Sequence, residues 1–183
     1  EKIKAQIGFA FSKNFGASNL VGDGHGDFIL YNNTGDEEYP DYSQLFFDVN
    51  LKYKGFSLVF EYADAFASGL NNIYSDPYGL NILHPQEISE YLVLGDSQGI
   101  QIGYFTKNGY SIDFVYEQFN PEFDLNINSV LNKSTNIGIG ISKYIVGNNL
   151  KLQASAFKTN FKNYFQIQDD EFISAAFLVQ IVF

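Results

Sequence analysis

The sequence predicts an all-β fold, an antiparallel transmembrane up-and-down β-barrel with about eight strands in this chain. Three observations lead to this prediction. Apolar residues recur with a period of two in eight separate segments, which is the pattern of β-strands with one apolar face. Long and short connections alternate between these segments. No apolar run approaches the ~18 residues that a transmembrane helix requires, so this chain would have to cross a membrane with strands.

The segment 171–183 has the clearest pattern of the eight. One file of alternate positions is apolar throughout, and the other file is mixed. The apolar file consists of Phe183, Ile181, Val179, Phe177, Ala175 and Ile173. A soluble sheet buries its apolar face, whereas a strand of a membrane barrel turns that face to lipid and its mixed face to the lumen. The segment therefore favours a membrane barrel.

The other seven segments show the same alternation. They are 2–12, 42–53, 56–63, 99–105, 110–117, 135–144 and 150–156. Three connections between them are short: Lys54-Gly55, the turn 107–109 with its Asn-Gly pair, and 146–149. Asn-Gly is a strong signal for a tight hairpin turn. The pattern predicts tight hairpins whose turns lie at one end of the sheet.

Four long connections belong to the opposite end. They are 13–41, 64–98, 119–134 and 161–170. Within them we expect a short strand at 28–31 and an extension of the next strand into 91–95. Outer-membrane barrels combine short periplasmic turns with long extracellular loops. The sequence thus predicts that the short turns face the periplasm and the long connections face outward.

Charge follows the same axis. Most of the 21 acidic residues fall in or beside the long connections, among them Asp23, Asp27, Asp36, Glu37, Glu38, Asp41, Asp76, Glu87, Glu90, Asp96, Glu122, Asp124, Asp169, Asp170 and Glu171. The lysines at the short-turn ends are Lys2, Lys4, Lys52, Lys54, Lys107, Lys143 and Lys151. We expect a negative outer mouth and a positive periplasmic end.

Composition limits the function classes. The chain has 183 residues, enough for a single domain or barrel segment over 1–183, and it begins at Glu1 rather than Met. We therefore expect a removed leader or a longer parent protein. The net charge of −10 argues against nucleic acid as a partner. The absence of cysteine excludes disulfides and thiol chemistry.

The mixed files supply the candidate pore-lining residues. They are Lys4, Gln6, Gln44, Asp48, Asn50, Lys52, Glu61, Gln101, Asp113, Glu117, Lys151 and Gln153. In a wide barrel these side chains line a water-filled pore. In a closed barrel of eight strands they form a buried polar network without a conduction path, because side chains fill so small an interior. The residues alone leave both alternatives open.

No catalytic or cofactor motif is present, so the sequence predicts neither an enzyme nor a cofactor. Asp113 and Glu117 share a strand face but lie about 13 Å apart at ~3.3 Å per residue, too far to act on one bond. His25 and His84 lie in separate long connections, and we expect them to be solvated rather than metal ligands. The acidic stretch 22–27 lacks the spacing of an EF-hand, and we expect a solvated turn there.

Two resemblances to known proteins sharpen these expectations. Phe177, Val179, Ile181 and Phe183 resemble the terminal strand of bacterial outer-membrane barrels, whose final aromatic residue is read by the barrel assembly machinery. The stretches 48–65, 100–122 and 137–157 resemble the carboxy-terminal half of the phosphate-selective porin O and P family. Their shared features are Lys-Gly between two strands, Gly-Tyr-Phe before a tight turn, Tyr-Glu followed by Asn-Pro, and Gly-Asn-Asn-Leu-Lys-Leu-Gln before the last strand.

The family resemblance implies a trimeric sixteen-stranded porin in the outer membrane of a Gram-negative bacterium. This chain would supply half of each barrel, with outer-membrane lipid, the barrel assembly machinery, small solutes or ions and a homotrimer as its partners. All 11 basic residues are Lys, so the pore arginines of phosphate-selective members are missing and anion selectivity is not expected. The first rival is a non-conducting eight-stranded barrel that acts as a scaffold, adhesion or complex-assembly protein through its acidic loops. An outer-membrane enzyme and a soluble lipocalin-like barrel are further alternatives.

Overall fold

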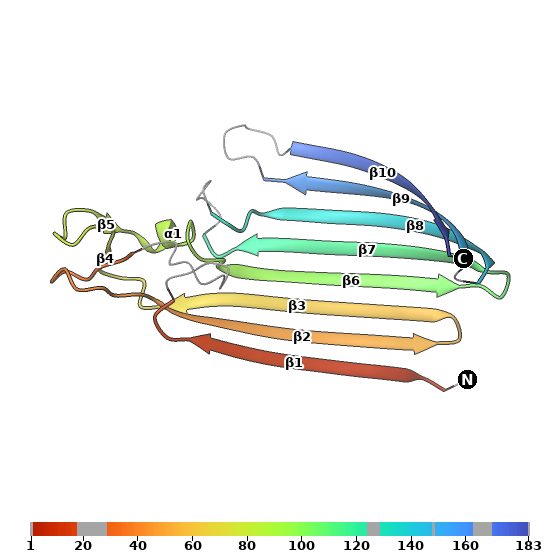
Figure 1. Cartoon of the computed structure of the whole chain (residues 1–183), viewed down its shortest axis with the longest axis horizontal. Coiled ribbons are helices and arrows are strands. Elements are labelled where there is room, and N and C mark those ends of the chain that lie inside the picture. The colour runs from red at the N-terminus through yellow and green to blue at the C-terminus, as the bar shows by residue number, and fades with distance from the viewer. Residues whose placement is uncertain (1, 18–28, 124–128, 148, 163–169, 183) are drawn as a thin grey trace.

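Eight long strands form one antiparallel sheet in the computed structural model, which describes residues 2–17, 29–123, 129–147, 149–162 and 170–182 (Figure 1). The strands are β1 (Lys4–Asn14), β2 (Asp41–Tyr53), β3 (Phe56–Ser68), β6 (Gly95–Phe105), β7 (Tyr110–Pro121), β8 (Ser134–Val146), β9 (Leu150–Phe161) and β10 (Asp170–Ile181). They follow one another across the sheet in chain order. The predicted number of strands, their order and the antiparallel pairing are confirmed.

Short turns join the strands at one end of the sheet, which we name the turn end, and the long connections lie at the other, the loop end (Figure 1). Between β2 and β3 the chain turns on two residues with positive φ, Lys54 at 48° and Gly55 at 84°. This is the requirement of a type I′ turn, whose twist matches that of the flanking strands. Gly109 closes the β6–β7 turn with φ of 76°.

The strands extend farther toward the loop end than the sequence pattern predicts. β3 continues to Ser68, and β6 begins at Gly95 rather than at residue 99. The apolar file turns polar there, since Asp64 pairs with Asp96 and Asp96 pairs with Asn120. Backbone pairing continues where the side-chain alternation stops. The strands therefore include Asp41, Asp96, Asp170 and Glu171, and the prediction that these residues lie in loops is wrong.

The long connection between β3 and β6 contains structure that the sequence analysis missed. A two-stranded sheet joins β4 (Ile73–Tyr74) to β5 (Ile82–Leu83), and a single helical turn, α1 (Pro85–Ile88), follows. The backbone N–H of His84 donates to the Glu87 carboxylate over 2.6 Å, and Pro85 starts the helix, where its missing N–H costs nothing. No helix in the described part of the chain has the length and apolar character needed to span a membrane.

Two smaller predictions in the long connections are not met as stated. Residues 91–94 do not extend β6, which starts at Gly95. Of the expected strand at 28–31, residue 28 lies outside the described residues, and Tyr31 forms only isolated bridges, with Glu37 and Tyr74.

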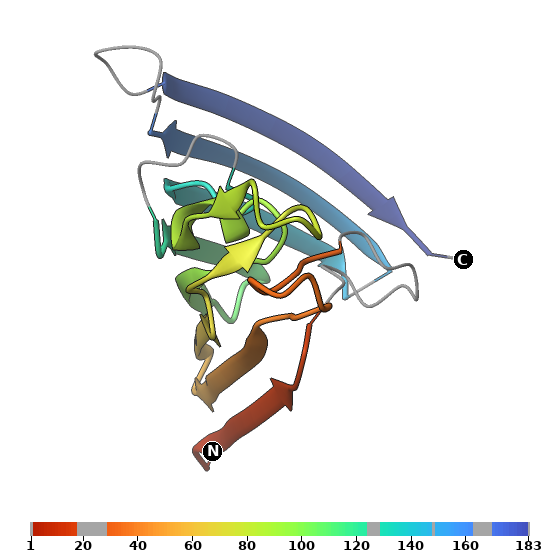
Figure 2. The same cartoon turned by 90° about the vertical axis from the view of Figure 1, so that its left-hand side faces the viewer.

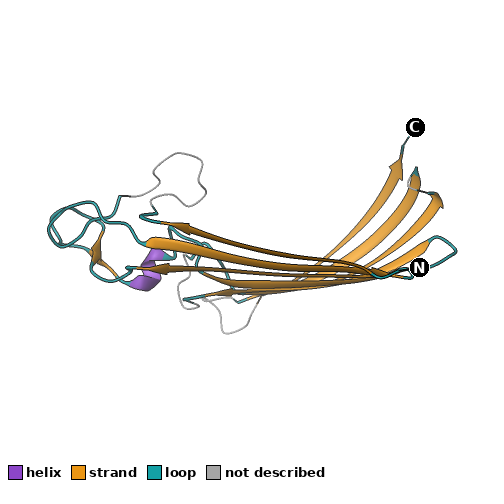
Figure 3. Cartoon of the chain, turned by 90° about the horizontal axis from the view of Figure 1, so that it is seen from below, coloured by secondary structure: helices purple, strands orange, loops and turns teal. Residues whose placement is uncertain are grey.

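The sheet is open. β1 pairs only with β2, and β10 pairs only with β9, so the two edge strands have no partner on their outer sides among the described residues. Figure 2 shows β1 and β10 at opposite extremes of the curved sheet. In Figure 3 the strands nearest the C-terminus bend away from those nearest the N-terminus at the turn end. A closed eight-stranded barrel, one of the two predicted forms, is therefore absent from this structure.

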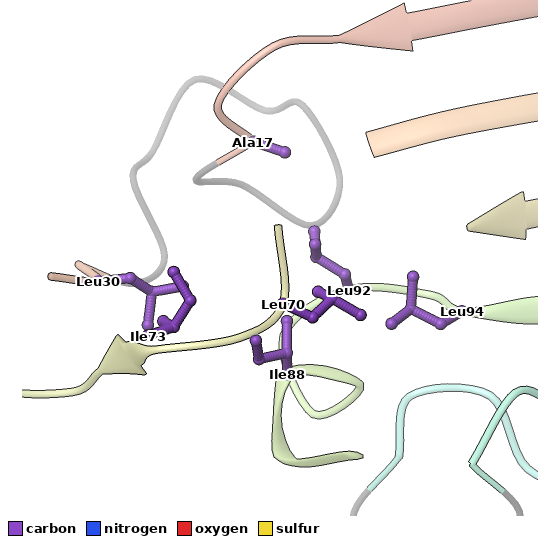
Figure 4. Close-up of a cluster of buried hydrophobic side chains, with 7 residues drawn as sticks. All are labelled: Ala17, Leu30, Leu70, Ile73, Ile88, Leu92 and Leu94. Carbon is purple, nitrogen blue, oxygen red and sulfur yellow. The ribbon is translucent and has the colours of Figure 1, made fainter. Parts of the chain in front are cut away.

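The buried apolar core lies outside the long strands. We name it the loop-end cluster, and it consists of Ala17, Leu30, Leu70, Ile73, Ile88, Leu92 and Leu94 (Figure 4). Tyr42 and Ala67, at the loop ends of β2 and β3, pack against it. The long connections therefore fold onto the end of the sheet around a small core of their own.

Candidate functional site

One face of the sheet carries all of the candidate pore-lining residues. Directly paired residues on neighbouring strands point to the same side of a sheet, and so do residues two apart on one strand. The observed registers place Lys4 beside Lys52, Gln6 beside Asn50, and Asp48 beside Glu61. The same rule brings the remaining candidates onto this side, which we name the mixed face.

Three neighbouring rows of the mixed face contain most of these residues. The row nearest the turns holds Lys4, Lys52, Ser57, Gly103, Asp113, Gly140 and Ser155. The next holds Gln6, Asn50, Val59, Gln101, Val115, Gly138 and Phe157. The third holds Gly8, Asp48, Glu61, Gly99, Glu117, Asn136 and Thr159. Gln44 lies nearer the loops, and Lys151 and Gln153 lie nearer the turns.

The third row concentrates negative charge, and we name Asp48, Glu61 and Glu117 the acidic row. Asp48 and Glu61 are direct cross-strand partners, and Gly99 separates Glu61 from Glu117. Like charges directly opposite each other repel. This arrangement is tolerable only where water or counter-ions reach the carboxylates, so the row is suited to a solvated surface.

Glycines on the mixed face make room for larger neighbours. A Cβ at Gly8 would collide with the Asp48 carboxylate, and one at Gly138 would collide with the Phe157 ring. A Cβ at Gly103 would meet both Asp113 and Ser57. The absence of a Cβ at these glycines lets neighbouring side chains lie flat across the sheet.

Hydrogen bonds on the mixed face involve three residues that were not among the candidate pore-lining residues: Asn136, Thr159 and Ser111. The Asn136 amide donates to Glu117 Oε2 over 2.9 Å and accepts from Thr159 Oγ1 over 3.0 Å. Nearer the turns, Ser111 Oγ donates to Asp113 over 3.0 Å. Asn136 shares its file with Gly138, Gly140 and Ser142, so strand parity alone could have identified it.

Two open hollows lie on this side of the sheet. One of about 390 Å³ borders the acidic row, and one of about 540 Å³ is lined by Gln101, Asp113, Lys151 and Gln153 among others. Both hollows are open to solvent and place charged and amide side chains around the space. The arrangement can contact hydrated ions or small polar solutes.

The opposite side, which we name the apolar face, exposes its hydrophobic side chains. Ile112 and Ile141 are 52% and 49% exposed, whereas their mixed-face neighbours Ser111 and Ser142 are only 8% and 4% exposed. In β10, Phe177, Val179 and Ile181 are exposed on the apolar face, and Phe183 lies outside the described residues. This alternation is the reverse of the pattern in a soluble sheet, where apolar residues are buried.

The apolar face has a limited height. In β7 it runs from Tyr110 to Tyr116, about 20 Å at ~3.3 Å per residue, and it then gives way to Gln118 and Asn120. These two amides form a polar chain that ends at Asp96, with contacts of 3.1 and 2.9 Å. Strands of outer-membrane barrels tilt by about 35–45°, so this length corresponds to a height of ~15 Å, which fits within their apolar band of ~25 Å.

Aromatic rings and lysines border the apolar face at the turn end. Tyr53, Phe56, Tyr104 and Tyr110 are all at least 40% exposed. The Lys143 ammonium lies 3.8 Å from the centre of the Tyr110 ring and donates to the Asn108 carbonyl. Amphipathic rings and long cationic side chains are typical of the interface between lipid and water.

The histidines and loop carboxylates form no metal centre in the part of the chain that is described, which holds no group of three or more candidate ligands. His84 caps α1, while His25 and the stretch 22–27 lie outside the described residues.

Burial raises the pKa of Glu122, and the negative charge of Asp64 raises it further.

Comparison with known proteins does not extend these observations, since no family model, no curated protein and no solved structure matches this chain.

Proposed function

We propose that this sheet is part of the wall of an outer-membrane pore for the passive diffusion of small solutes or ions. The observation that carries the proposal is the reversed alternation in β7 and β8, where isoleucines are exposed on one face and serines are sheltered on the other. An apolar surface of this size in water would aggregate, whereas in a bilayer it is the required surface. The mixed face then lines the lumen.

Selection in such a pore acts through width and charge. The acidic row would attract cations and repel anions from the lumen, because fixed carboxylates raise the local concentration of counter-ions. The structured loop end would narrow the outer entrance. This agrees with the absence of arginine, which removes the strongest ligand for phosphate from the wall.

The proposal extends to location and partners. We place the chain in the outer membrane of a Gram-negative bacterium, with lipid against the apolar face and the barrel assembly machinery acting on the strand that contains Phe177, Val179 and Ile181. The resemblance to the phosphate-selective porins supports this placement, and a homotrimer is part of what it implies. Neither an enzymatic activity nor a cofactor forms part of the proposal.

Conductance in a planar lipid bilayer tests the proposed function. We expect the native polypeptide to form ion channels that pass K⁺ in preference to Cl⁻. The double variant Asp48→Asn/Glu61→Gln should lose much of that preference, because two charges leave the lumen. Glu38→Gln, which removes one charge from a loop, should shift the reversal potential less. A folded, lipid-inserted protein without conductance would refute the pore.

A second candidate function is supported by the loop end. Tyr78 and Leu80 are 83% and 79% exposed in the long connection that carries the loop-end cluster. Exposed apolar residues on a loop with its own core suit a binding partner, as the scaffold or adhesion alternative requires. The test compares the parent protein with a Tyr78→Ser/Leu80→Ser variant. This function would be favoured if neither protein conducts ions and the variant no longer binds cells or outer-membrane proteins.

A further inference from the structure

Two phenylalanines stand among small side chains on the mixed face. On the loop side of the acidic row, the observed registers align four residues of neighbouring strands: Phe46, Ala63, Ser97 and Phe119. Phe46 is 42% exposed, on the side of the sheet that carries the sheltered serines. Aromatic rings that share a hollow with a few polar groups are typical of sites for small molecules.

The hollow of about 390 Å³ lies between these two rings, and we name it the aromatic hollow. Phe46 in β2 and Phe119 in β7 form its sides, about 14 Å apart along the sheet at ~4.8 Å per strand. Its floor consists of small residues of the two strands between them: Ala63, Ser97 and Gly99. Sites for small molecules occupy ~300–1,000 Å³, a range that includes this volume.

The acidic row borders the same hollow on its turn side. Glu61 and Glu117 flank Gly99, and Asp48 lies beside Glu61. A Cβ at Gly99 would lie 3.8 Å from Glu117 Cγ, so the Glu117 side chain extends toward the glycine. Among the described residues, the Asn136 amide donates a hydrogen bond to Glu117, and no lysine forms an ion pair with the acidic row. The sheet itself therefore supplies no cation for these charges.

An organic ammonium ion matches both parts of the aromatic hollow. Its charged group fits over Gly99, between Glu61 and Glu117, where it donates charge-assisted hydrogen bonds to the carboxylates. Its apolar body fits against Phe46 and Phe119, whose ring faces also attract a cation. A hydrated inorganic ion uses only the carboxylates, and an anion is repelled by them. The combination therefore favours amines over the other classes of small ion.

We propose that the aromatic hollow binds small primary amines in their ammonium form. Glu61 and Glu117 hold the ammonium group, and Phe46 and Phe119 hold the apolar body. The inference rests on the proposed pore and names a class of solute that its wall recognises.

Calorimetric titration with phenethylammonium chloride tests the proposal. The native polypeptide, at the length in which the cell makes it, is held in detergent micelles, and empty micelles supply the blank. Glu61→Gln/Glu117→Gln should weaken binding about tenfold or more, because two charge-assisted contacts are lost. Glu38→Gln, which removes a charge from a loop, should leave the affinity unchanged. Phenethyl alcohol has the same apolar body without the charge and should bind far more weakly.

The rings have a test of their own. Phe46→Leu and Phe119→Leu keep an apolar side chain but remove the ring face, so each should weaken binding by roughly two- to fivefold. Phe161→Leu is the matched control. Phe161 lies in the same row as Phe119, joined to it through Ser134, but does not line the aromatic hollow. Its substitution should leave the affinity unchanged.

Gly99→Val tests the floor of the hollow without changing a charge. The nearest atom to an added Cβ is 3.8 Å away, so the strand accepts the side chain, which then occupies the place of the ammonium group. We expect no detectable binding. Gly140→Val is the matched control, because its Cβ has equally open surroundings, at 3.9 Å, and lies outside the aromatic hollow. This variant should bind the probe as the parent does.

Two results would overturn the proposal. Glu61→Gln/Glu117→Gln could bind the probe as tightly as the parent, or Gly99→Val could retain binding, and either would mean that the probe binds elsewhere. Conductance separates this failure from failure of the pore. A conducting channel that the probe neither binds nor blocks refutes the site and leaves the pore in place. Binding that depends on Gly99 and both glutamates, in a protein that does not conduct, supports the site and refutes the pore.

Discussion

The eight-stranded sheet and the loop-end cluster treat apolar side chains in opposite ways. In the loop-end cluster, Leu30, Ile73 and Leu94 are almost completely buried, as in the core of a soluble domain. In the sheet, isoleucines and phenylalanines of the apolar face remain exposed while serines and glycines on the mixed face are sheltered. The same chain therefore contains a region that folds as if in water and a region suited to lipid.

The difference agrees with the proposal that the two regions meet different solvents. Water drives the side chains of the loop-end cluster together, at about 25 cal/mol for each Å² of apolar area that is covered. A bilayer needs no such core, because lipid tails are as apolar as the side chains. Substitutions in the two regions should therefore act through different mechanisms.

The largest effect is expected in the loop-end cluster. Leu94→Ala removes a fully buried side chain and leaves a cavity, at a cost of about 2–5 kcal/mol in the local unfolding free energy. Hydrogen exchange of the amides in 70–94 should accelerate accordingly. Leu80→Ala, at an exposed position of the same connection, should change the local unfolding free energy measured by exchange by less than about 0.5 kcal/mol. Equal effects of the two substitutions would mean that the cluster is not a core.

A charge on the apolar face should have the next largest effect. Ile139→Lys places an ammonium on the face that we propose to contact the bilayer, and such substitutions cost about 2–4 kcal/mol near the midplane of membrane barrels. Urea unfolding of the lipid-folded protein measures this loss. Gln101→Lys, on the mixed face, should be close to neutral. If Gln101→Lys is the more damaging of the two, the assignment of the faces is reversed.

A smaller loss is expected in the polar contacts of the mixed face. Asn136→Ala removes the hydrogen bonds to Glu117 and Thr159, each worth about 0.5–1.5 kcal/mol. Thr159→Val removes only one of them and should cost about half as much. Urea unfolding under the same conditions provides the comparison, and a neutral Asn136→Ala would show that water replaces both bonds.

The smallest effect concerns pH in an exposed turn of the loops. Burial acts to raise the pKa of Asp76, but the backbone N–H groups of Asn81, Leu80 and Tyr78 donate to its carboxylate and lower the pKa overall. The stability from this carboxylate is present above the ordinary aspartate pKa and is lost as the pH falls through the lowered one. Protease cleavage within 75–81 should therefore increase in acid for the native chain. Asp76→Asn should cleave at a rate that does not change over this pH range.

Strand periodicity predicted the sheet because period-two alternation is a local signal. It located Ile137 and Ile139 on one face and Asn136 on the other, and it located the short turns that join β2 to β3 and β6 to β7. It failed near the loop end, where Asp64, Asp96 and Asn120 replace apolar residues although pairing continues. The alternation had ended there, so nothing local marked the longer strands.

The loop-end cluster was invisible in the sequence for a different reason. Ala17, Leu30 and Leu94 come from separate connections and acquire meaning only when the sheet brings these connections together. The acidic row presents the same problem, since Asp48, Glu61 and Glu117 become neighbours through register rather than spacing. Sequence parity could place each residue on the mixed face, but only the pairing across strands could align them in one row.

The accessibility of side chains along β8 to lipid and to water shows whether the apolar face of the sheet meets a bilayer. Single cysteines at Ile137, Ile139 and Ile141, and at Asn136, Gly140 and Ser142, can be spin-labelled in liposomes because the chain has no other cysteine. If the apolar face meets lipid, we expect high collision rates with oxygen, which dissolves in lipid, at the three isoleucine positions. We expect high collision rates with a water-soluble nickel complex at the other three. The reverse alternation, or water contact at all six positions, would contradict a sheet whose apolar face meets lipid.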